Sequence, residues 1–277
     1  MATPATAPVR PTLQPGMPVV EFSHVSIAFE RGLVLNDISF TVTHGETCLL
    51  LGPAGVGKSV IMKLANGLLT PDSGEVRIFG RPLSSLTPDE MFAMRAHIGM
   101  VFQESALFDS LNVEDNVAYR LEEEHCPTAE IHRRVLEALH FVELESAVDK
   151  FPSELSGGMR RRVSIARAII SKPDLILYDS PTGGLDPITS TTIIELIVKQ
   201  RDVSQTTSLL ITHRIQDAFT LATHRYSTAA GKMELIPNGG IDPSTKFLVL
   251  NEARIVFDGA TQELTRTTDS WLQSFLS

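Results

Sequence analysis

Residues 52–59 read GPAGVGKS and match the phosphate-binding pattern G-x-x-x-x-G-K-S/T. An apolar run, Thr47–Leu51, precedes this stretch, and a helix-like run, Val60–Leu69, follows it. Glycines let the backbone N–H groups of such a loop turn inward around phosphate oxygens, and the helix N-terminus adds partial positive charge. The sequence therefore predicts a nucleoside triphosphate site built from Gly52, Pro53, Ala54, Gly55, Val56, Gly57, Lys58 and Ser59.

A magnesium site is expected beside this loop. Lys58 is placed to reach the β- and γ-phosphates, and the Ser59 hydroxyl to bind Mg²⁺. The short apolar run Leu175–Tyr178 is typical of a buried parallel strand, and Asp179 follows at its C-terminal end. A carboxylate there can hold the Mg²⁺ shell from the side opposite Ser59. The sequence thus predicts that the nucleotide binds together with Mg²⁺.

A second anion site is expected at LSGGM, residues 155–159. Ser156, Gly157 and Gly158 precede a helical stretch, Met159–Ser171, with apolar residues on one face. A serine cap followed by two glycines leaves free backbone donors with the helix dipole behind them. In most proteins SGG before a helix is plain capping. Its place near the phosphate loop and near DSPTGGLDP, residues 179–187, favours anion binding here.

These segments occur in the order and spacing of an ATP-binding-cassette (ABC) ATPase domain, which the chain resembles from about Val20 to about Leu264. The resemblance implies an α/β P-loop NTPase fold with a mostly parallel core sheet, an N-terminal antiparallel β subdomain and an inserted helical subdomain. It also implies that the nucleotide is ATP and that two domains enclose two ATP molecules head to tail. Each phosphate loop then faces the SGG turn of the opposite subunit.

The resemblance assigns roles to four further residues. Gln103, after the apolar run Ile98–Phe102, matches the glutamine that senses Mg²⁺ and the γ-phosphate and faces the membrane partner. His213 matches the histidine that contacts the γ-phosphate, and Asp186 matches the aspartate that bridges two copies. Phe29 matches the aromatic residue that stacks on adenine. Without the resemblance, the sequence favours Phe29 as a core residue and His213 as a structural histidine.

Ser180 departs from the family pattern at a catalytic position. The family carries a glutamate there, which orients or deprotonates the attacking water. A neutral hydroxyl has no carboxylate to accept the proton, and a missing general base costs about 10²–10⁴ in rate. Ser180 is also a turn residue before Pro181, and both descriptions can hold. We therefore expect either an ATPase with impaired hydrolysis or a hydrolysis-deficient subunit that ATP binding alone switches.

The chain is expected to divide into an ATPase domain and two terminal segments. Residues 1–18, rich in Pro, Ala and Thr, are predicted to form a disordered tail. Residues 19–264 are expected to form the ATPase domain, with its helical subdomain at about 103–152. A turn-rich insertion is expected at about 228–245, as a partner-binding loop or a neutral surface addition. Residues 265–277 are predicted to hold a C-terminal helix.

Composition narrows the function classes. The 277 residues are 43% hydrophobic, enough for one large core with a subdomain. The net charge of −9 argues against nucleic acid as a partner. The consecutive arginines Arg160, Arg161 and Arg162 are expected to form a solvated or interface face of a helix. Cys48 in a predicted core strand and Cys126 in a polar loop indicate a reducing compartment.

Two helical stretches, Val113–Glu124 and Ala129–Leu144, are predicted for the helical subdomain, which in ABC transporters receives a coupling helix from the membrane subunit. No apolar run approaches the roughly 18 residues that span a bilayer. We therefore expect a peripheral protein at the cytoplasmic face of the bacterial inner membrane. Its expected partners are a second ATPase subunit, as a homodimer, and transmembrane permease subunits.

The transporter class is suggested by Ala106–Leu121, which resembles the ATPase subunits of Mla/Mce-type lipid transporters. LSGGMRRRVSIARAI, residues 155–169, and GLDPITS, residues 184–190, indicate the same class. This resemblance implies lipid-binding Mce-type subunits and small regulatory subunits as further partners. ATPases of amino-acid importers share much of the pattern, so an importer remains an alternative. The negative net charge and a length that fits one ATPase unit argue against the ABC proteins that act on chromosomes or ribosomes.

Overall fold

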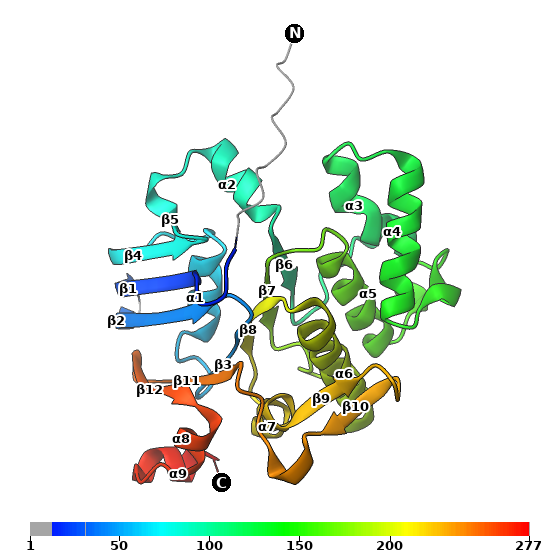
Figure 1. Cartoon of the computed structure of the whole chain (residues 1–277). Coiled ribbons are helices and arrows are strands. Elements are labelled where there is room, and N and C mark those ends of the chain that lie inside the picture. The colour runs from blue at the N-terminus through cyan, green and yellow to red at the C-terminus, as the bar shows by residue number, and fades with distance from the viewer. Residues whose placement is uncertain (1–12, 31, 277) are drawn as a thin grey trace.

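A six-stranded sheet in the order β12-β11-β3-β8-β7-β6 forms the centre of the computed structural model, which describes residues 13–30 and 32–276 (Figure 1). Neighbouring strands pair in parallel, except β12, which is antiparallel to β11. The parallel strands are short apolar runs, as expected where helices cover both faces. The strands are β3 (Thr47–Leu51), β6 (Ile98–Val101), β7 (Leu175–Asp179), β8 (Thr207–Ile211), β11 (Thr245–Asn251) and β12 (Arg254–Ala260).

Alternate residues of the core strands enter two separate hydrophobic clusters. In β3, Leu49 and Leu51 belong to one cluster, whereas Cys48 and Leu50 belong to the other. Side chains of a strand alternate between its faces, so one apolar run can serve both layers. The first face packs against α5 (Gly157–Ile169), α6 (Pro187–Ser204) and α7 (Ile215–Thr223). The second packs against α1 (Lys58–Ala65) and the N-terminal sheet.

The N-terminal sheet is antiparallel, in the order β2-β1-β4-β5. Its strands are β1 (Pro18–Phe29), β2 (Gly32–Thr43), β4 (Ser73–Ile78) and β5 (Arg81–Pro82), and α2 (Pro88–Arg95) follows. Of the predicted tail, residues 1–12 lie outside the described residues. Leu13 already packs against the core, and β1 begins at Pro18. The predicted fold class, with mostly parallel core sheet and antiparallel N-terminal sheet, is confirmed.

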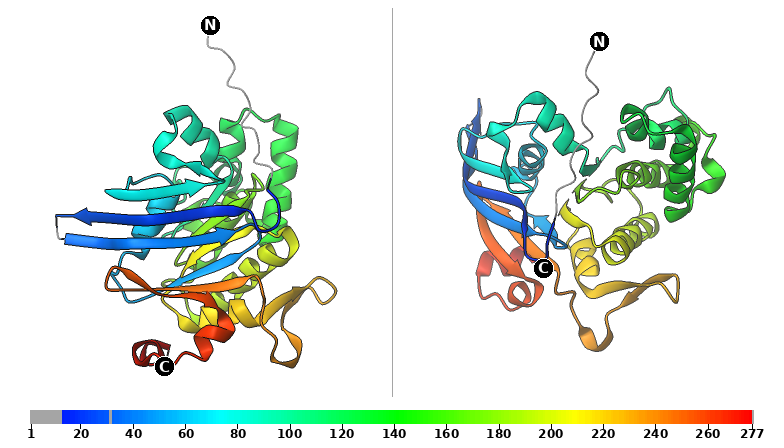
Figure 2. Two further views of the ribbon diagram at one scale, coloured as in Figure 1. Left: turned by 60° about the vertical axis from the view of Figure 1, so that its left-hand side comes forward. Right: turned by 45° about the horizontal axis from the view of Figure 1, so that its top comes forward.

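The helical region contains α3 (Val113–Glu123) and α4 (Thr128–Phe141), which agree with the two predicted helices. Figure 2 shows this pair on the opposite side of the core sheet from the antiparallel sheet. Asn112 caps α3 by accepting a hydrogen bond from the Asp115 N–H. Asn116 is fully buried and bonds to backbone groups of Phe108 and Leu111, so it fixes the loop that enters α3.

The hairpin of β9 (His224–Ser227) and β10 (Lys232–Leu235) lies below α6 and to the right of α7 in Figure 1. Its first strand begins before the predicted insertion at 228–245. Arg201 of α6 anchors it: the guanidinium donates to the carbonyls of Leu221 and His224, at 2.6 and 2.7 Å, and pairs with Asp242 at 3.0 Å. The chain ends on α8 (Thr261–Thr265) and α9 (Ser270–Leu276).

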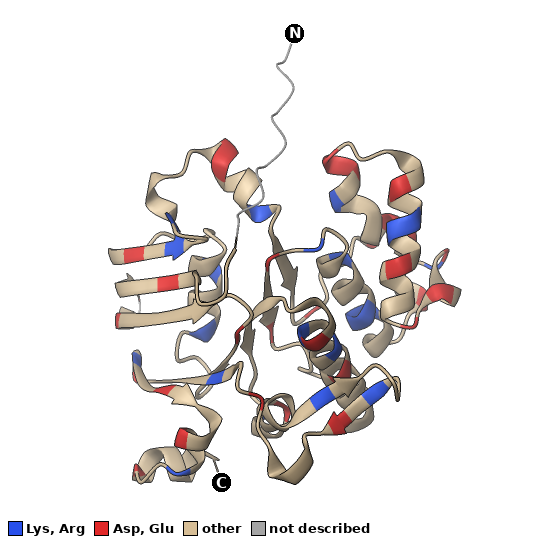
Figure 3. Ribbon diagram, viewed as in Figure 1, with Lys and Arg blue, Asp and Glu red and all other residues tan. Residues whose placement is uncertain are grey.

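Charged residues of both signs are interspersed over the described elements (Figure 3). None of the helices in the described ranges is long and apolar enough to cross a membrane.

Candidate functional site

The phosphate-binding loop joins the end of β3 to the start of α1. Gly52 and Gly57 have φ of +146° and +108°, a region that side chains rarely adopt. A Cβ on Gly52 would stand 2.3 Å from the carbonyl oxygen of Leu250, and one on Gly57 would stand 2.9 Å from Cδ2 of Leu35. Both glycines are therefore required by backbone conformation and by close packing.

Lys58 is the first residue of α1 and is only 4% exposed. Its ammonium group donates hydrogen bonds to the carbonyl oxygens of Gly52 and Pro53, both at 2.7 Å, so the side chain lies back across the loop. Burial lowers the pKa of Lys58 to about 8, and the negative charge of Asp179 acts in the opposite direction. The lysine is thus a partly desolvated cation inside the loop, suited to a phosphate.

Ser59 and Asp179 meet at the ends of α1 and β7. The Ser59 hydroxyl hydrogen-bonds the Asp179 carboxylate. Burial raises the pKa of Asp179, while the positive charges of Lys58 and Lys63 and the hydrogen bond from Ser59 favour its ionised form. One hydroxyl and one carboxylate fit Mg²⁺, because this ion takes few protein oxygens and completes its shell with water and phosphate.

Ser180 follows Asp179 in a left-handed backbone conformation, with φ of +48°. Its N–H donates to the carbonyl of Ile211 at 3.0 Å, and its carbonyl accepts from Gly183 N–H at 2.9 Å. The side chain is buried, and its hydroxyl has no hydrogen-bond partner among the described residues. This hydroxyl is therefore shielded from solvent water.

His213 and Gln103 follow β8 and β6 at the same edge of the sheet. Burial and the positive charge of Lys58 lower the pKa of His213, whereas Asp179 opposes the shift. The Gln103 side chain lies against Gly183, since a Cβ there would stand 3.3 Å from Cγ of Gln103. The carboxyl ends of parallel strands are where open α/β sheets bind ligands. The structure thus gathers at this edge the residues that the sequence predicted for one site.

Phe29 ends β1 opposite Gly32, and the residue is 45% exposed. It is therefore not a core residue, which removes the alternative that the sequence left open. An exposed aromatic ring at a strand end can stack on a planar base.

The SGG turn lies at the start of α5, against Leu185 and Thr189. The Ser156 hydroxyl accepts a hydrogen bond from Met159 N–H, so it caps the helix. Asp186 caps α6 in the same way, by accepting from the N–H groups of Ile188 and Thr189 at 3.0 Å. Within the described residues no hydrogen bond joins Ser156, Gly157 or Gly158 to the phosphate loop. In the described part of the chain, the SGG turn and the phosphate loop are therefore not joined by a direct hydrogen bond.

The prediction that the three consecutive arginines form a solvated or interface face is wrong for Arg161. This residue is 4% exposed, and its guanidinium donates to backbone carbonyls of Ser180 and Gln103. Arg160 and Arg162 also donate to backbone carbonyls, those of Leu155 and Val142. The sequence held a signal for this: successive helix residues point about 100° apart, so three neighbours do not share one face of the helix.

Comparison with known proteins agrees with this architecture. The ABC transporter family model matches residues 35–183. Protein TRIGALACTOSYLDIACYLGLYCEROL 3 of Arabidopsis thaliana is 37% identical over 266 residues, which are 93% of this chain and 73% of that protein. The intermembrane phospholipid transport system ATP-binding protein MlaF of Escherichia coli is 33% identical over 253 residues, 90% of this chain and 86% of that protein.

Methionine import ATP-binding protein MetN 1 of Bacillus thuringiensis is 34% identical over 263 residues, 94% of this chain and 73% of that protein. Among solved structures, the dimeric ATP-binding cassette MJ0796 bound to ADP and Pi superposes with a TM-score of 0.73 at 28% identity, covering 87% of this chain and 98% of that one. The family model spans more than half of the chain. The chain belongs to the ABC transporter family, as an ATPase subunit that couples ATP hydrolysis to transport.

Proposed function

We propose that this chain is the ATPase subunit of an Mla/Mce-type transporter that moves phospholipids or other apolar lipids, at the cytoplasmic face of a bacterial inner membrane. The observation that carries this proposal is the 33% identity to MlaF, a phospholipid transport protein, over 86% of its length. MlaF of Haemophilus influenzae is 36% identical over 211 residues. The plant relative carries a lipid in its name as well.

ATP binds with its phosphates in the loop at 52–59 and its adenine against Phe29. Lys58 neutralises phosphate charge, and the helix dipole of α1 adds to it. Ser59, Asp179 and Gln103 would hold Mg²⁺, an ion that neutralises charge on the phosphates when it is bound. Burial and the positive charge of Lys58 lower the pKa of His213 and so favour its neutral imidazole, whose N–H can donate one hydrogen bond to a γ-phosphate oxygen.

The working form is a homodimer in which each phosphate loop faces the SGG turn of the other copy. One chain carries both features but does not join them, which supports a site completed by a partner. Asp186 lies exposed at the start of α6, where it can bridge the two copies. The related cassette MJ0796 is a dimer in its ADP- and Pi-bound structure.

Hydrolysis in this dimer is slow because Ser180 supplies no general base. The buried and unpartnered hydroxyl supports this, since it cannot accept a proton from a water in the site. Loss of the base costs about 10²–10⁴ in rate. ATP binding then closes the dimer, and a slow chemical step reopens it.

The permease docks in a groove of about 320 Å³ between β6, α3 and α5. Exposed aromatic side chains line it, with Phe102 36%, Phe108 42% and Tyr119 41% exposed. Arg167 stacks over the Phe108 ring at 5.9 Å, so the groove offers apolar faces with cationic edges. Such a surface suits an amphipathic coupling helix. Mce-type and small regulatory subunits would complete the assembly.

An amino-acid importer is the second candidate, because MetN 1 is 34% identical over 263 residues. The test is to purify the membrane complex that the tagged chain forms and reconstitute it in liposomes. ATP-dependent movement of a fluorescent phospholipid, without uptake of labelled methionine, supports the proposal. Methionine uptake without lipid movement would assign the chain to the importer class instead.

A further inference from the structure

Arg161, on the first turns of α5, ties three segments of the nucleotide site together. One terminal nitrogen of its guanidinium donates to the carbonyl oxygen of Ser180 at 3.2 Å. The other donates to the carbonyl of Gln103 and, at 3.4 Å, to that of Gly183. The residue is 4% exposed, so these bonds form away from solvent.

In the proposed dimer the three carbonyls belong to loops that serve one ATP, while Arg161 belongs to α5, whose SGG turn serves the other. We propose that Arg161 is a positioning residue that couples the two half-sites of each chain. It holds the loops at 103 and 180–183 at a fixed distance from the SGG turn. Closure of one ATP site at the SGG turn then aligns these loops, which serve hydrolysis in the other site. This inference rests on the proposed ATP-bound dimer.

The backbone of Ser180 explains why such a tie is needed. A left-handed conformation, with φ of +48°, is unfavourable for a residue with a Cβ and persists only where the surroundings hold it. The Ser180 carbonyl accepts from Gly183 N–H within its own turn and from Arg161 across the helix. Arg161 is the one side chain in the described residues that donates to this carbonyl. It therefore fixes the backbone at the position of the water-activating residue.

A purely structural role does not account for a buried guanidinium here. Burial lowers the pKa of Arg161, and within the described ranges no carboxylate lies at ion-pair distance from it; Glu104 acts on it from further away. Its Nε is buried without a hydrogen-bond partner. Buried charge that is incompletely paired is destabilising, and an apolar side chain of this size would pack at lower cost. Arginine at this position therefore costs folding stability but makes three hydrogen bonds to the nucleotide-site loops.

Arg162 provides a matched control on the same helix. Its guanidinium donates to the carbonyls of Val142 and Glu143, at 3.1 and 3.3 Å, which belong to the helical subdomain and not to the nucleotide site. Arg162→Met therefore removes the same number of charges and a similar set of bonds. It tests general loss of packing without touching the loops at 103 and 180–183.

The experiment compares Arg161→Met, Arg161→Lys and Arg162→Met in the full-length chain carrying Ser180→Glu, in the assembled complex. Affinity for a fluorescent ATP analogue, KM and kcat are measured for each. A displacement of about 1 Å in a reacting group costs on the order of 10² in rate. We expect Arg161→Met to lower kcat about 100-fold while affinity and KM change less than about 3-fold. The kcat of Arg161→Lys should be at least about tenfold higher than that of Arg161→Met. The kcat of Arg162→Met should be less than about fivefold lower than that of the parent.

The inference is overturned if Arg161→Met lowers kcat no more than Arg162→Met does, or if affinity falls in parallel with kcat. Should Arg161→Met fail to fold, Arg161→Gln, which keeps N–H donors without the charge, is judged by the same criteria. A Ser180→Glu parent that neither binds nor hydrolyses ATP would defeat the proposed function together with this inference. An active parent with an unaffected Arg161→Met would defeat the inference alone.

Discussion

A Cβ atom on Gly158 would stand 2.4 Å from Cγ2 of Thr189, so the SGG turn packs directly on the start of α6. Gly158 has no left-handed backbone, and the restriction is therefore one of space. The Thr189 hydroxyl donates to Asp186 at 2.5 Å, which joins the same contact to the cap of α6. Two segments that the dimer model assigns to the interface are thus held at a fixed distance.

Gly158→Ala is expected to separate these segments and to lower the free energy of unfolding by about 1–3 kcal/mol, as overpacking does. ATP-dependent dimerisation, measured by light scattering, should weaken as well. Thr189→Ser removes the obstructing methyl group and keeps the hydroxyl that donates to Asp186. The double variant should therefore regain most of the stability and dimerisation. Equal loss in the single and double variants would show that the contact is not the cause.

The pH dependence of nucleotide binding should report the charge of Lys58. Burial holds its pKa at about 8, below the usual value of about 10.4. Affinity for an ATP analogue should therefore fall by up to about tenfold per pH unit above pH 8, since the neutral amine attracts phosphate weakly. Arginine stays charged over this pH range, so Lys58→Arg should remove the fall in affinity above pH 8. A flat profile in the parent chain would contradict the assignment.

The stability of the nucleotide-free chain should change in the opposite direction. Between pH 8 and about 10.4 the unfolded chain binds a proton on Lys58 that the folded chain has released. The contribution of Lys58 to the free energy of unfolding therefore rises with pH in this window and is smallest below pH 8. Comparison of denaturant midpoints for the parent and Lys58→Met isolates this contribution.

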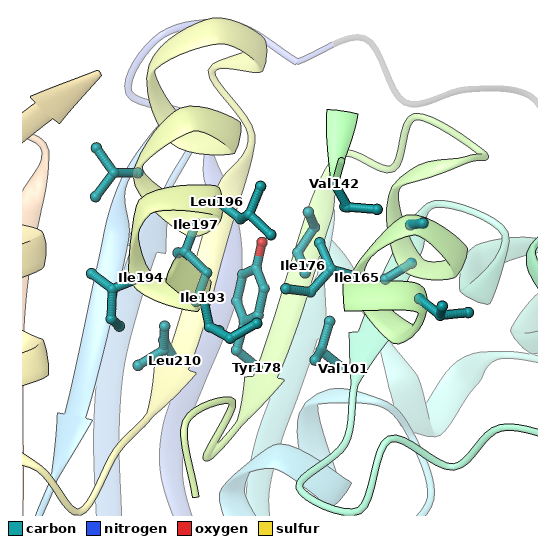
Figure 4. Packing of buried hydrophobic residues seen from close by; sticks show 14 of the residues in the cluster. Val101, Val142, Ile165, Ile176, Tyr178, Ile193, Ile194, Leu196, Ile197 and Leu210 are labelled. Carbon is teal, nitrogen blue, oxygen red and sulfur yellow. The ribbon is translucent and has the colours of Figure 1, made fainter. Parts of the chain in front are cut away.

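Tyr178→Phe should leave stability unchanged or raise it. Figure 4 shows the Tyr178 ring among Ile176, Ile193 and Leu196. The residue is fully buried, and its hydroxyl has no hydrogen-bond partner among the described residues. An unsatisfied buried hydroxyl costs about 1–3 kcal/mol, so its removal should raise the melting temperature by about 2–4 °C. A fall of that size would reveal a partner for the hydroxyl.

Arg201→Met should loosen the β9–β10 hairpin. The guanidinium bonds to Leu221, His224 and Asp242, and its removal leaves buried acceptors without a donor. We expect a loss of about 3–5 kcal/mol in the free energy of unfolding, as when one partner of a buried ion pair is removed. Hydrogen exchange should rise first in residues 224–245. Arg225→Met, at an exposed position, is the control and should change little.

The sequence was sufficient for the strands and helices that carry the nucleotide site. The predicted strand Thr47–Leu51 has the bounds of β3, because a buried parallel strand is a short apolar run between turn residues. Boundaries shifted where caps decide them: α5 begins at Gly157, before the predicted Met159, since the Ser156 cap starts the helix.

Two features of the site could not be read from the pattern. The left-handed backbone of Ser180 depends on bonds to Ile211 and Arg161, which lie far along the chain. The burial of Arg161 depends on the packing of α5 against β6, a tertiary contact that overrides the charge of the residue. Sequence periodicity reports the local element, and it does not report which loops that element reaches.

ATP turnover by the assembled membrane complex, for the chain as it stands and for Ser180→Glu, tests the role of Ser180 most directly. If the general base is absent because residue 180 is serine, Ser180→Glu should raise kcat by about 10²–10⁴ and leave the affinity for the nucleotide nearly unchanged. Similar and substantial turnover by both chains would show that another group activates the water, and it would contradict the slow hydrolysis proposed for this protein.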